Sequence, residues 1–195
     1  MTTRERMTEM RGAVAVAVVE GAQLGSVHRI LLDTASLRIV GFSLRHNVLG
    51  RESFVPSEAV TLVGEDVLFV KDRASLAPAP PAGVRSLKDL QGLPVATLEG
   101  KGLGGLVDLD VEPGRWAVTS LRLSDGTAIP TDGGKVVLGE DTVLVDPELA
   151  SRGKKEGSPQ GFLSRMFGAE ALEETARVIR RTFGRREAGE DKKQP

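Results

Sequence analysis

Two stretches of the chain are near copies of each other, and this repetition constrains the fold more than any single residue does. Residues 16–25 read VAVVEGAQLG and residues 95–104 read VATLEGKGLG, so six of ten aligned positions are identical. The aligned glutamates, Glu20 and Glu99, are 79 residues apart. A chain that repeats itself is interpreted as a pair of modules before any residue is interpreted as a site.

The similarity extends beyond these stretches and predicts two modules whose apolar segments keep the same register. Phe-Val-Pro at residues 54–56 corresponds to Ala-Ile-Pro at residues 128–130, and a Gly-Glu-Asp turn occurs at both Gly64 and Gly139. Four further apolar positions correspond at the 79-residue offset: Val27, Ile30, Phe42 and Leu44 with Leu106, Leu109, Leu121 and Leu123.

The composition is that of a soluble globular protein of one or two domains. The chain has 195 residues, of which 40% are hydrophobic and 27% charged. It has no cysteine, which excludes disulfides, thiolate metal sites and cysteine nucleophiles. No apolar run reaches the ~20 residues of a membrane span, and the first twelve residues lack the apolar core of a secretory signal. We therefore expect a cytoplasmic protein.

Short segments rich in Val, Leu and Ile, separated by Gly or Pro, predict an all-β fold in which each module is a small barrel or sandwich. The modules are expected at residues 10–75 and 84–148, with no long helix before residue 150. The proline-rich residues 76–83 between them predict a semi-stiff spacer, followed by a helical turn at residues 86–90 capped by Ser86. The candidate strands are residues 13–19, 24–32, 37–44, 53–56, 59–63, 66–71, 94–98, 103–111, 116–123, 127–130, 135–138 and 142–146.

The C-terminal region differs from the repeated body in charge and pattern. The polar residues 151–160 predict a flexible link, residues 160–184 a helical tail with an amphipathic helix, and the last residues a disordered end. The body is mildly acidic and the tail is basic. The candidate partner-binding residues all lie in this tail: Phe162, Leu163, Met166, Phe167, Leu172, Arg177, Ile179, Arg180 and Phe183.

The order of these motifs, seen twice, resembles the PRC-barrel domain. The shared segment is V-A-x-x-E-G-x-x-L-G, followed by an alternating strand, a Val-Pro or Ile-Pro step and a Gly-Glu-Asp turn before a last strand. The match covers residues 14–71 and 87–146. The resemblance implies six-stranded barrels in tandem. The family includes the cytoplasmic domain of the photosynthetic reaction-centre H subunit and the C-terminal half of a ribosome-maturation factor, so it also implies a docking or regulatory role.

Three patterns resemble chemical sites and are better explained structurally. Gly100, Gly102 and Gly105 match the letters of a dinucleotide-binding loop, but the following residues alternate at period two, which indicates a strand and not the required helix. The Gly-Glu-Asp sequences are typical of hairpin turns. His28 and His46 lack the spacing of a metal pair or a catalytic base, and both are expected at the surface.

Asp108, Asp110 and Glu112 alternate along one predicted strand. Three carboxylates on one face could collect a hard cation such as Ca²⁺. A strand offers no loop to wrap around an ion, however, and antiparallel sheets commonly have one wet side. We therefore expect a solvated acidic face.

These observations predict a non-enzymatic scaffold, protein-binding module or regulatory adaptor, with no cofactor and no metal. The tail is expected to pack on the barrels, bind a partner protein or lie on a membrane surface, and the sequence leaves these three open, as it does a homo-oligomer. A ribosome- or RNA-associated assembly factor is the alternative, suggested by the basic tail. A small-molecule-binding barrel is disfavoured because only 4% of residues are aromatic.

Overall fold

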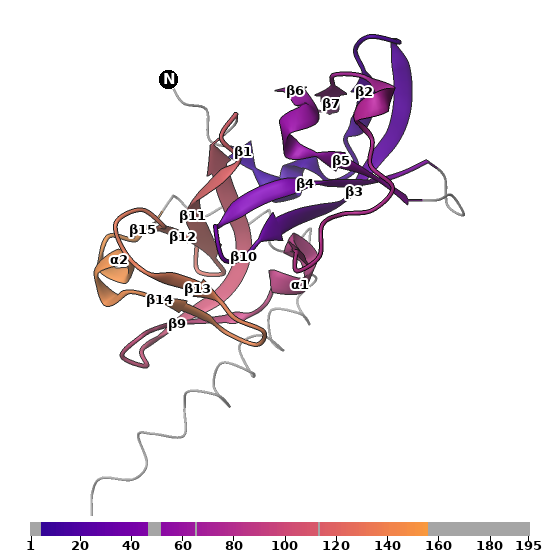
Figure 1. The fold of residues 1–195 in the computed structure, drawn as a ribbon. Helices are drawn as coiled ribbons and strands as arrows, with labels where there is room; N and C mark the ends of the chain where they lie inside the picture. The colour runs from indigo at the N-terminus through magenta and orange to yellow at the C-terminus, as the bar shows by residue number, and fades with distance from the viewer. Residues whose placement is uncertain (1–4, 47–51, 65, 113, 156–195) are drawn as a thin grey trace, which may run out of the picture. The chain divides into compact units, whose positions relative to one another are not determined.

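A computed structural model describes residues 5–46, 52–64, 66–112 and 114–155. The chain divides into two compact units (Figure 1). Unit 1 comprises residues 1–91 and 108–120, and unit 2 comprises residues 92–107 and 121–195. The predicted tail and the nine candidate residues in it lie outside the described residues.

The described residues are predominantly β, as the sequence predicts, and each of the twelve candidate strands corresponds to a strand whose ends differ by at most two residues. The helices are short. They are η1 (Met7–Met10), η2 (Ser57–Ala59), η3 (Arg73–Ser75), α1 (Leu87–Leu90) and α2 (Pro147–Ser151). The strands are β1 (Glu5–Arg6), β2 (Val14–Ala17), β3 (Ala22–Asp33), β4 (Arg38–Arg45), β5 (Glu52–Pro56), β6 (Val60–Val63), β7 (Val67–Val70), β8 (Arg85–Ser86), β9 (Pro94–Thr97), β10 (Gly102–Glu112), β11 (Ala117–Leu123), β12 (Thr127–Pro130), β13 (Val136–Leu138), β14 (Val143–Val145) and β15 (Lys154–Lys155).

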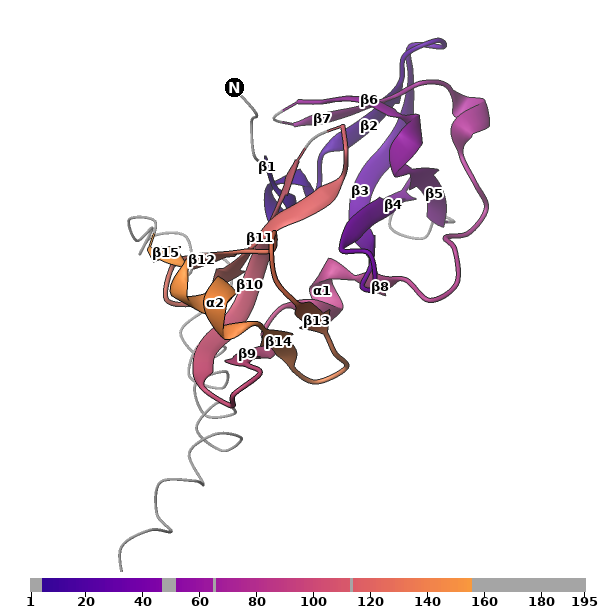
Figure 2. The same cartoon turned by 60° about the vertical axis from the view of Figure 1, so that its left-hand side comes forward.

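In unit 1, a curled sheet has the strand order β5-β4-β3-β2-β7-β6 (Figure 2). Only the β2–β7 pair is parallel, and the other neighbours in this order are antiparallel. Alternate residues of β2 and β7 are buried, and Phe42 of β4 is fully covered. Its ring meets that of Trp116 edge-on, with centroids 5.3 Å apart. Burying a side chain of this size stabilises the fold by about 1.5–3 kcal/mol.

In unit 2, strands pair in the order β13-β14-β9-β10, and again only the middle pair, β14–β9, is parallel. Val95, Val143 and Val145 are fully buried. The helix α2 begins with Pro147 after the cap Asp146, whose carboxylate accepts a hydrogen bond from the Glu148 N–H at 3.0 Å. A proline at this position costs no intrahelical hydrogen bond.

The Gly-Glu-Asp sequences form the predicted hairpin turns. The N–H of Gly64 donates to the carbonyl of Val67 at 2.8 Å, and the N–H of Gly139 donates to the carbonyl of Thr142 at 3.0 Å. The first turn joins β6 to β7 and the second joins β13 to β14. The two hairpins therefore close with the same backbone contact.

The register that the alignment of the two repeats predicts is wrong at the first strand of each repeat, β2 and β9. Ala15 pairs with Gly25, and Val95 pairs with Gly104, each next to a bulge in the longer strand. Val16, which the sequence aligns with Val95, therefore occupies the opposite face: it is half-buried, and Val95 is fully buried. A shift of one residue exchanges the two faces of a strand.

Strands β4 and β11 meet at a symmetric junction within unit 1. The N–H of Ile39 donates to the carbonyl of Trp116 at 2.8 Å, and the N–H of Val118 donates to the carbonyl of Leu37 at 2.9 Å. Leu37 and Trp116 also share a left-handed backbone, with φ of 53° and 55°. Each pair of positions differs by 79 residues, so the two hydrogen bonds join corresponding positions of the sequence repeat.

Three local predictions concern the glycines of residues 100–105, the proline-rich segment and the helical turn after it. Gly102 and Gly105 lie in strand β10 and no helix follows them, as expected for the structural interpretation. The proline-rich segment, in contrast, is not a detached spacer: Ala77 and Phe54 exchange backbone hydrogen bonds of 2.8 and 3.0 Å. The helical turn is α1, and its cap Ser86 accepts from the Lys88 N–H at 3.2 Å.

Candidate binding groove

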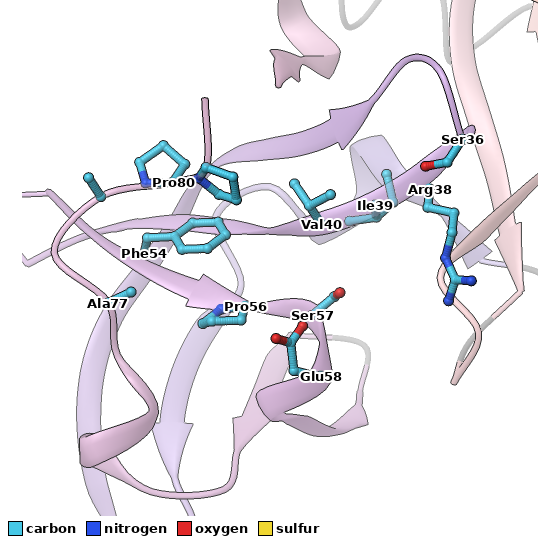
Figure 3. Close-up of a pocket in the computed structure, with 12 residues that line it drawn as sticks. Ser36, Arg38, Ile39, Val40, Phe54, Pro56, Ser57, Glu58, Ala77 and Pro80 are labelled. Carbon is cyan, nitrogen blue, oxygen red and sulfur yellow. The ribbon is translucent and has the colours of Figure 1, made fainter. Parts of the chain in front are cut away.

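A groove of about 610 Å³ lies in unit 1 between strands β4 and β5 and the proline-rich segment (Figure 3). Eight of its twelve lining residues are apolar in type, and its polar residues are Ser36, Arg38, Ser57 and Glu58. The apolar lining residues are Ile39, Val40, Phe54, Pro56, Ala77, Ala79, Pro80 and Pro81.

The groove exists because the proline-rich segment is held along β5. Phe54 is 4% exposed, and its backbone pairs with Ala77 on one side while β5 pairs with β4 on the other. Beyond Ala77 the chain continues through Pro80 and Pro81, which have no N–H to donate and hold an extended backbone. Ala79 and Pro80 are exposed, so this wall of the groove is accessible.

Two charged side chains, Arg38 and Glu58, line the groove together with the apolar residues. The Arg38 guanidinium donates to the carbonyl of Arg115 at 2.6 Å, which uses one of its five N–H donors. Glu58 is exposed. Ser36 is positioned by Asp33, whose carboxylate accepts from the Ser36 hydroxyl at 2.7 Å and lies 2.9 Å from the Ala35 nitrogen. These hydrogen bonds hold the pKa of Asp33 below its usual value.

The predicted acidic face on β10 is wrong for two of its three members. Asp108 is 2% exposed and Asp110 1% exposed, because β1 and η1 cover this part of the strand. Thr8 donates its hydroxyl and its N–H to the Asp108 carboxylate, and the Ser120 hydroxyl donates to Asp110. Only Glu112 is partly exposed.

Burial raises the pKa of Asp108 to about 6, against the opposing effect of the Thr8 hydroxyl and with a smaller contribution from the Asp110 charge. Water is excluded from a carboxylate in such a place, so the charged form is disfavoured. Because Thr8 and the Leu109 N–H occupy its oxygens, Asp108 serves the fold as an internal acceptor.

A second polar cluster lies on β3, β4 and β5 around Glu52. Its carboxylate is 3.0 Å from Arg29, 3.8 Å from Arg45 and 3.7 Å from His28. The Arg45 guanidinium approaches His28 Nε2 at 2.7 Å, so the ring nitrogen must be the acceptor. Burial, helped by the charge of Arg45, lowers the pKa of His28.

The two histidines agree with the surface expectation. The His28 side chain is 31% exposed and His46 is exposed. Within the described ranges, no group of three or more His, Cys, Asp or Glu side chains could hold a metal ion. In the same part of the chain, no helix has the length and apolar character needed to cross a membrane.

Four large apolar side chains of the described residues are exposed on hairpins. Val18 is 54% and Val19 73% exposed in the turn after β2, and Leu98 is 48% exposed in the turn after β9. Leu62, 59% exposed, lies on β6, which ends the strand order of unit 1.

Sequence reasoning missed the groove and the role of Thr8. The only local signs of the groove are the Phe-Val-Pro sequence at residues 54–56 and the proline-rich run at residues 76–83, and nothing in the sequence places the two together. No protein-family model and no curated protein sequence matches this chain.

Proposed function

We propose that this protein is a non-enzymatic protein-binding adaptor built on two PRC-barrel-like modules that arose by duplication. The observation that carries the proposal is the groove of unit 1, with its apolar lining residues and its two opposite charges. The repeated strand pairing and the symmetric junction support the duplication. The basic tail, residues 160–184, docks on the partner or on the modules in this proposal.

The ligand of the groove is an extended peptide segment of a partner protein. The exposed residues Ala79, Pro80 and Pro81 offer apolar contacts to such a segment. Arg38 selects a carboxylate on that segment, and Glu58 selects a basic side chain, because charge complementarity favours the correct partner and register. The proline wall adds little ordering cost on binding, since its backbone is already constrained.

The test uses the full chain and two matched arginine substitutions. Ala79→Arg places a long side chain in the groove, whereas Ala74→Arg places the same side chain at an exposed position of η3 that does not line the groove. Peptides are selected on the unaltered protein from a displayed library of random 12-residue sequences. Their affinities are then measured by fluorescence anisotropy.

We expect selected peptides to carry apolar residues with an acidic and a basic position, and to lose at least tenfold in affinity with Ala79→Arg but not with Ala74→Arg. Equal affinity for all three proteins would reject the groove. Binding of ribosomal RNA that weakens steeply with salt, in place of peptide binding, would favour the assembly-factor alternative. Deleting residues 160–184 tests the tail separately, in the same assay.

A further inference from the structure

The N-terminal residues 5–10, here called the arm, make one connected set of contacts on β10. Its first strand pairs antiparallel with β10, with Arg6 opposite Asp110. Met7 and Met10 are 1% and 4% exposed, so the arm buries apolar side chains as well as backbone. All of these contacts lie within unit 1.

One side chain of β10 receives the polar contacts of the arm. The Thr8 nitrogen lies 3.2 and 3.3 Å from the two Asp108 oxygens, and the Thr8 hydroxyl donates to the same carboxylate. These groups are 100 residues apart in the chain and both are buried. A carboxylate left there without these donors would be far more costly, since an unpaired buried charge is strongly disfavoured.

The arm is joined to β2 through Arg11 and Gly12, both of which are exposed. Gly12 has φ of 89°, and a Cβ placed on it would meet nothing within 4 Å. The Gly12 N–H donates to the Val27 carbonyl of β3 at 2.9 Å, so Gly12 stays with the sheet and release of the arm requires rotation at Arg11.

We infer that residues 5–10 form a releasable cover on β10, latched by the Thr8–Asp108 contact, and that raising the pH through the weakly acidic range favours its release. Release admits water to Asp108 and uncovers the apolar surface under Met7 and Met10, together with the β10 edge at Asp110 and Val111. The inference is independent of the groove.

The direction of the pH effect on arm opening depends on which protonation state of Asp108 the closed and the open arm each prefer. With the arm closed, burial disfavours the charged carboxylate, and the neighbouring Asp110 adds repulsion. With the arm open, Asp108 is hydrated and ionises at its ordinary pH. The other charged groups near the latch are Arg6 and Glu9, which pair with each other at 3.5 Å at the surface.

The size of the pH effect on arm opening follows from the linkage between protonation of Asp108 and opening of the arm. If opening returns the pKa of Asp108 from about 6 to 3.8, the open fraction of the arm rises about tenfold between pH 5 and pH 7.5. Partial burial in the open form makes this figure an upper value.

Amide hydrogen exchange of the full chain measures the opening directly. The readout is protection of the Met7–Met10 amides, corrected for the intrinsic pH dependence of exchange, with core amides of β4 as the reference. We expect about tenfold less protection at pH 7.5 than at pH 5, while the β4 amides change little. A change of less than twofold at the arm would overturn the inference.

Two substitutions separate the latch from general stability. Asp108→Asn should abolish the pH dependence of arm opening, whereas Asp33→Asn, at an exposed carboxylate, should leave it unchanged. A tenfold pH effect that survives in Asp108→Asn would refute the role of this carboxylate. If that variant does not fold, Thr8→Val supplies the test: it should raise arm opening about fivefold at both pH values, as expected for one lost hydrogen bond, and no increase would reject the latch.

Discussion

The hairpin of β2 and β3 and the hairpin of β9 and β10 share a bulged strand but differ in turn length and in surroundings. Both carry a bulge beside a glycine with a left-handed backbone, Gly25 with φ of 126° and Gly104 with φ of 133°. The turn before the first bulge encloses four residues, whereas the second encloses three. The shared leucine-glycine step therefore marks the bulge, and the difference in turn length shifts the preceding strand by one residue.

The comparison extends to side chains on the longer strands. Arg29 on β3 and Asp108 on β10 are 79 residues apart, yet the Arg29 side chain is 49% exposed and pairs with Glu52, while Asp108 is buried under the arm. Equivalent positions thus have unlike environments because only one of them is covered. What the hairpins share is a requirement of the backbone, and what they do not share is decided by neighbouring segments.

The largest expected difference concerns the two bulge glycines. A Cβ on Gly25 would lie 2.7 Å from the Arg45 carbonyl oxygen, whereas a Cβ on Gly104 would lie 3.2 Å from the Ser124 hydroxyl, which can move. Backbone strain costs both variants ~1–3 kcal/mol. We therefore expect Gly25→Ala to lose about 4 kcal/mol of unfolding free energy and Gly104→Ala about 2 kcal/mol. Urea unfolding measures both, and equal losses would contradict the difference in surroundings.

The second-largest expected effect is a pH dependence of the unfolding free energy, caused by Asp108. Its folded pKa of about 6 lies above the ordinary 3.8, so its stabilising contribution is full below pH 3.8 and is lost as the pH rises through 6. The loss amounts to about 3 kcal/mol at most. The unfolding free energy of the unaltered protein minus that of Asp108→Asn should fall by about 2.4 kcal/mol between pH 4 and pH 7. A flat profile would refute the assignment.

A smaller effect tests the shifted strand. Val95→Ala should lose about 2 kcal/mol, because it removes two buried methyl groups and leaves a cavity. Val16→Ala should lose under about 1 kcal/mol, since Val16 is only half-buried and solvent fills the space. Thermal and urea unfolding of the two variants provide the measurement. Equal losses would favour the register that the sequence alignment predicts.

The smallest effect is expected at the surface cluster. Arg29→Ala removes the 3.0 Å ion pair with Glu52, but both side chains are at least one-third exposed. Pairs of this kind contribute about 0.2–1 kcal/mol, and Arg45 remains near the same carboxylate. We expect a loss under about 0.5 kcal/mol that vanishes in 1 M salt. A loss above about 2 kcal/mol would show that Arg29, like Asp108, lies in a buried environment.

Much of the secondary structure could be predicted because its causes are local. Alternating apolar residues located the strands, and Gly64 and Gly139 located two hairpin turns. The α1 turn follows from Ser86 as its cap. Each of these depends on a few neighbouring residues, whose spacing the chain displays directly.

The candidate site could not be predicted in the same way. The groove requires Ala77 to pair with Phe54, and the buried carboxylate requires Thr8 to reach Asp108, 100 residues away. The sequence pattern of a strand with alternating acidic residues is the same whether water or another segment covers its acidic face. That is why the expected wet face proved to be buried at Asp108 and Asp110.

By itself, the sequence determined where this chain must turn, where it bulges and which segments become strands, because glycine geometry and the two-residue period of a strand act over a few bonds. Tertiary structure alone decided which equivalent positions are covered, which carboxylate loses its water, and that a proline-rich connection becomes the wall of a groove. Burial depends on segments that meet only after the chain has folded, and the free energy of a buried charge depends on burial.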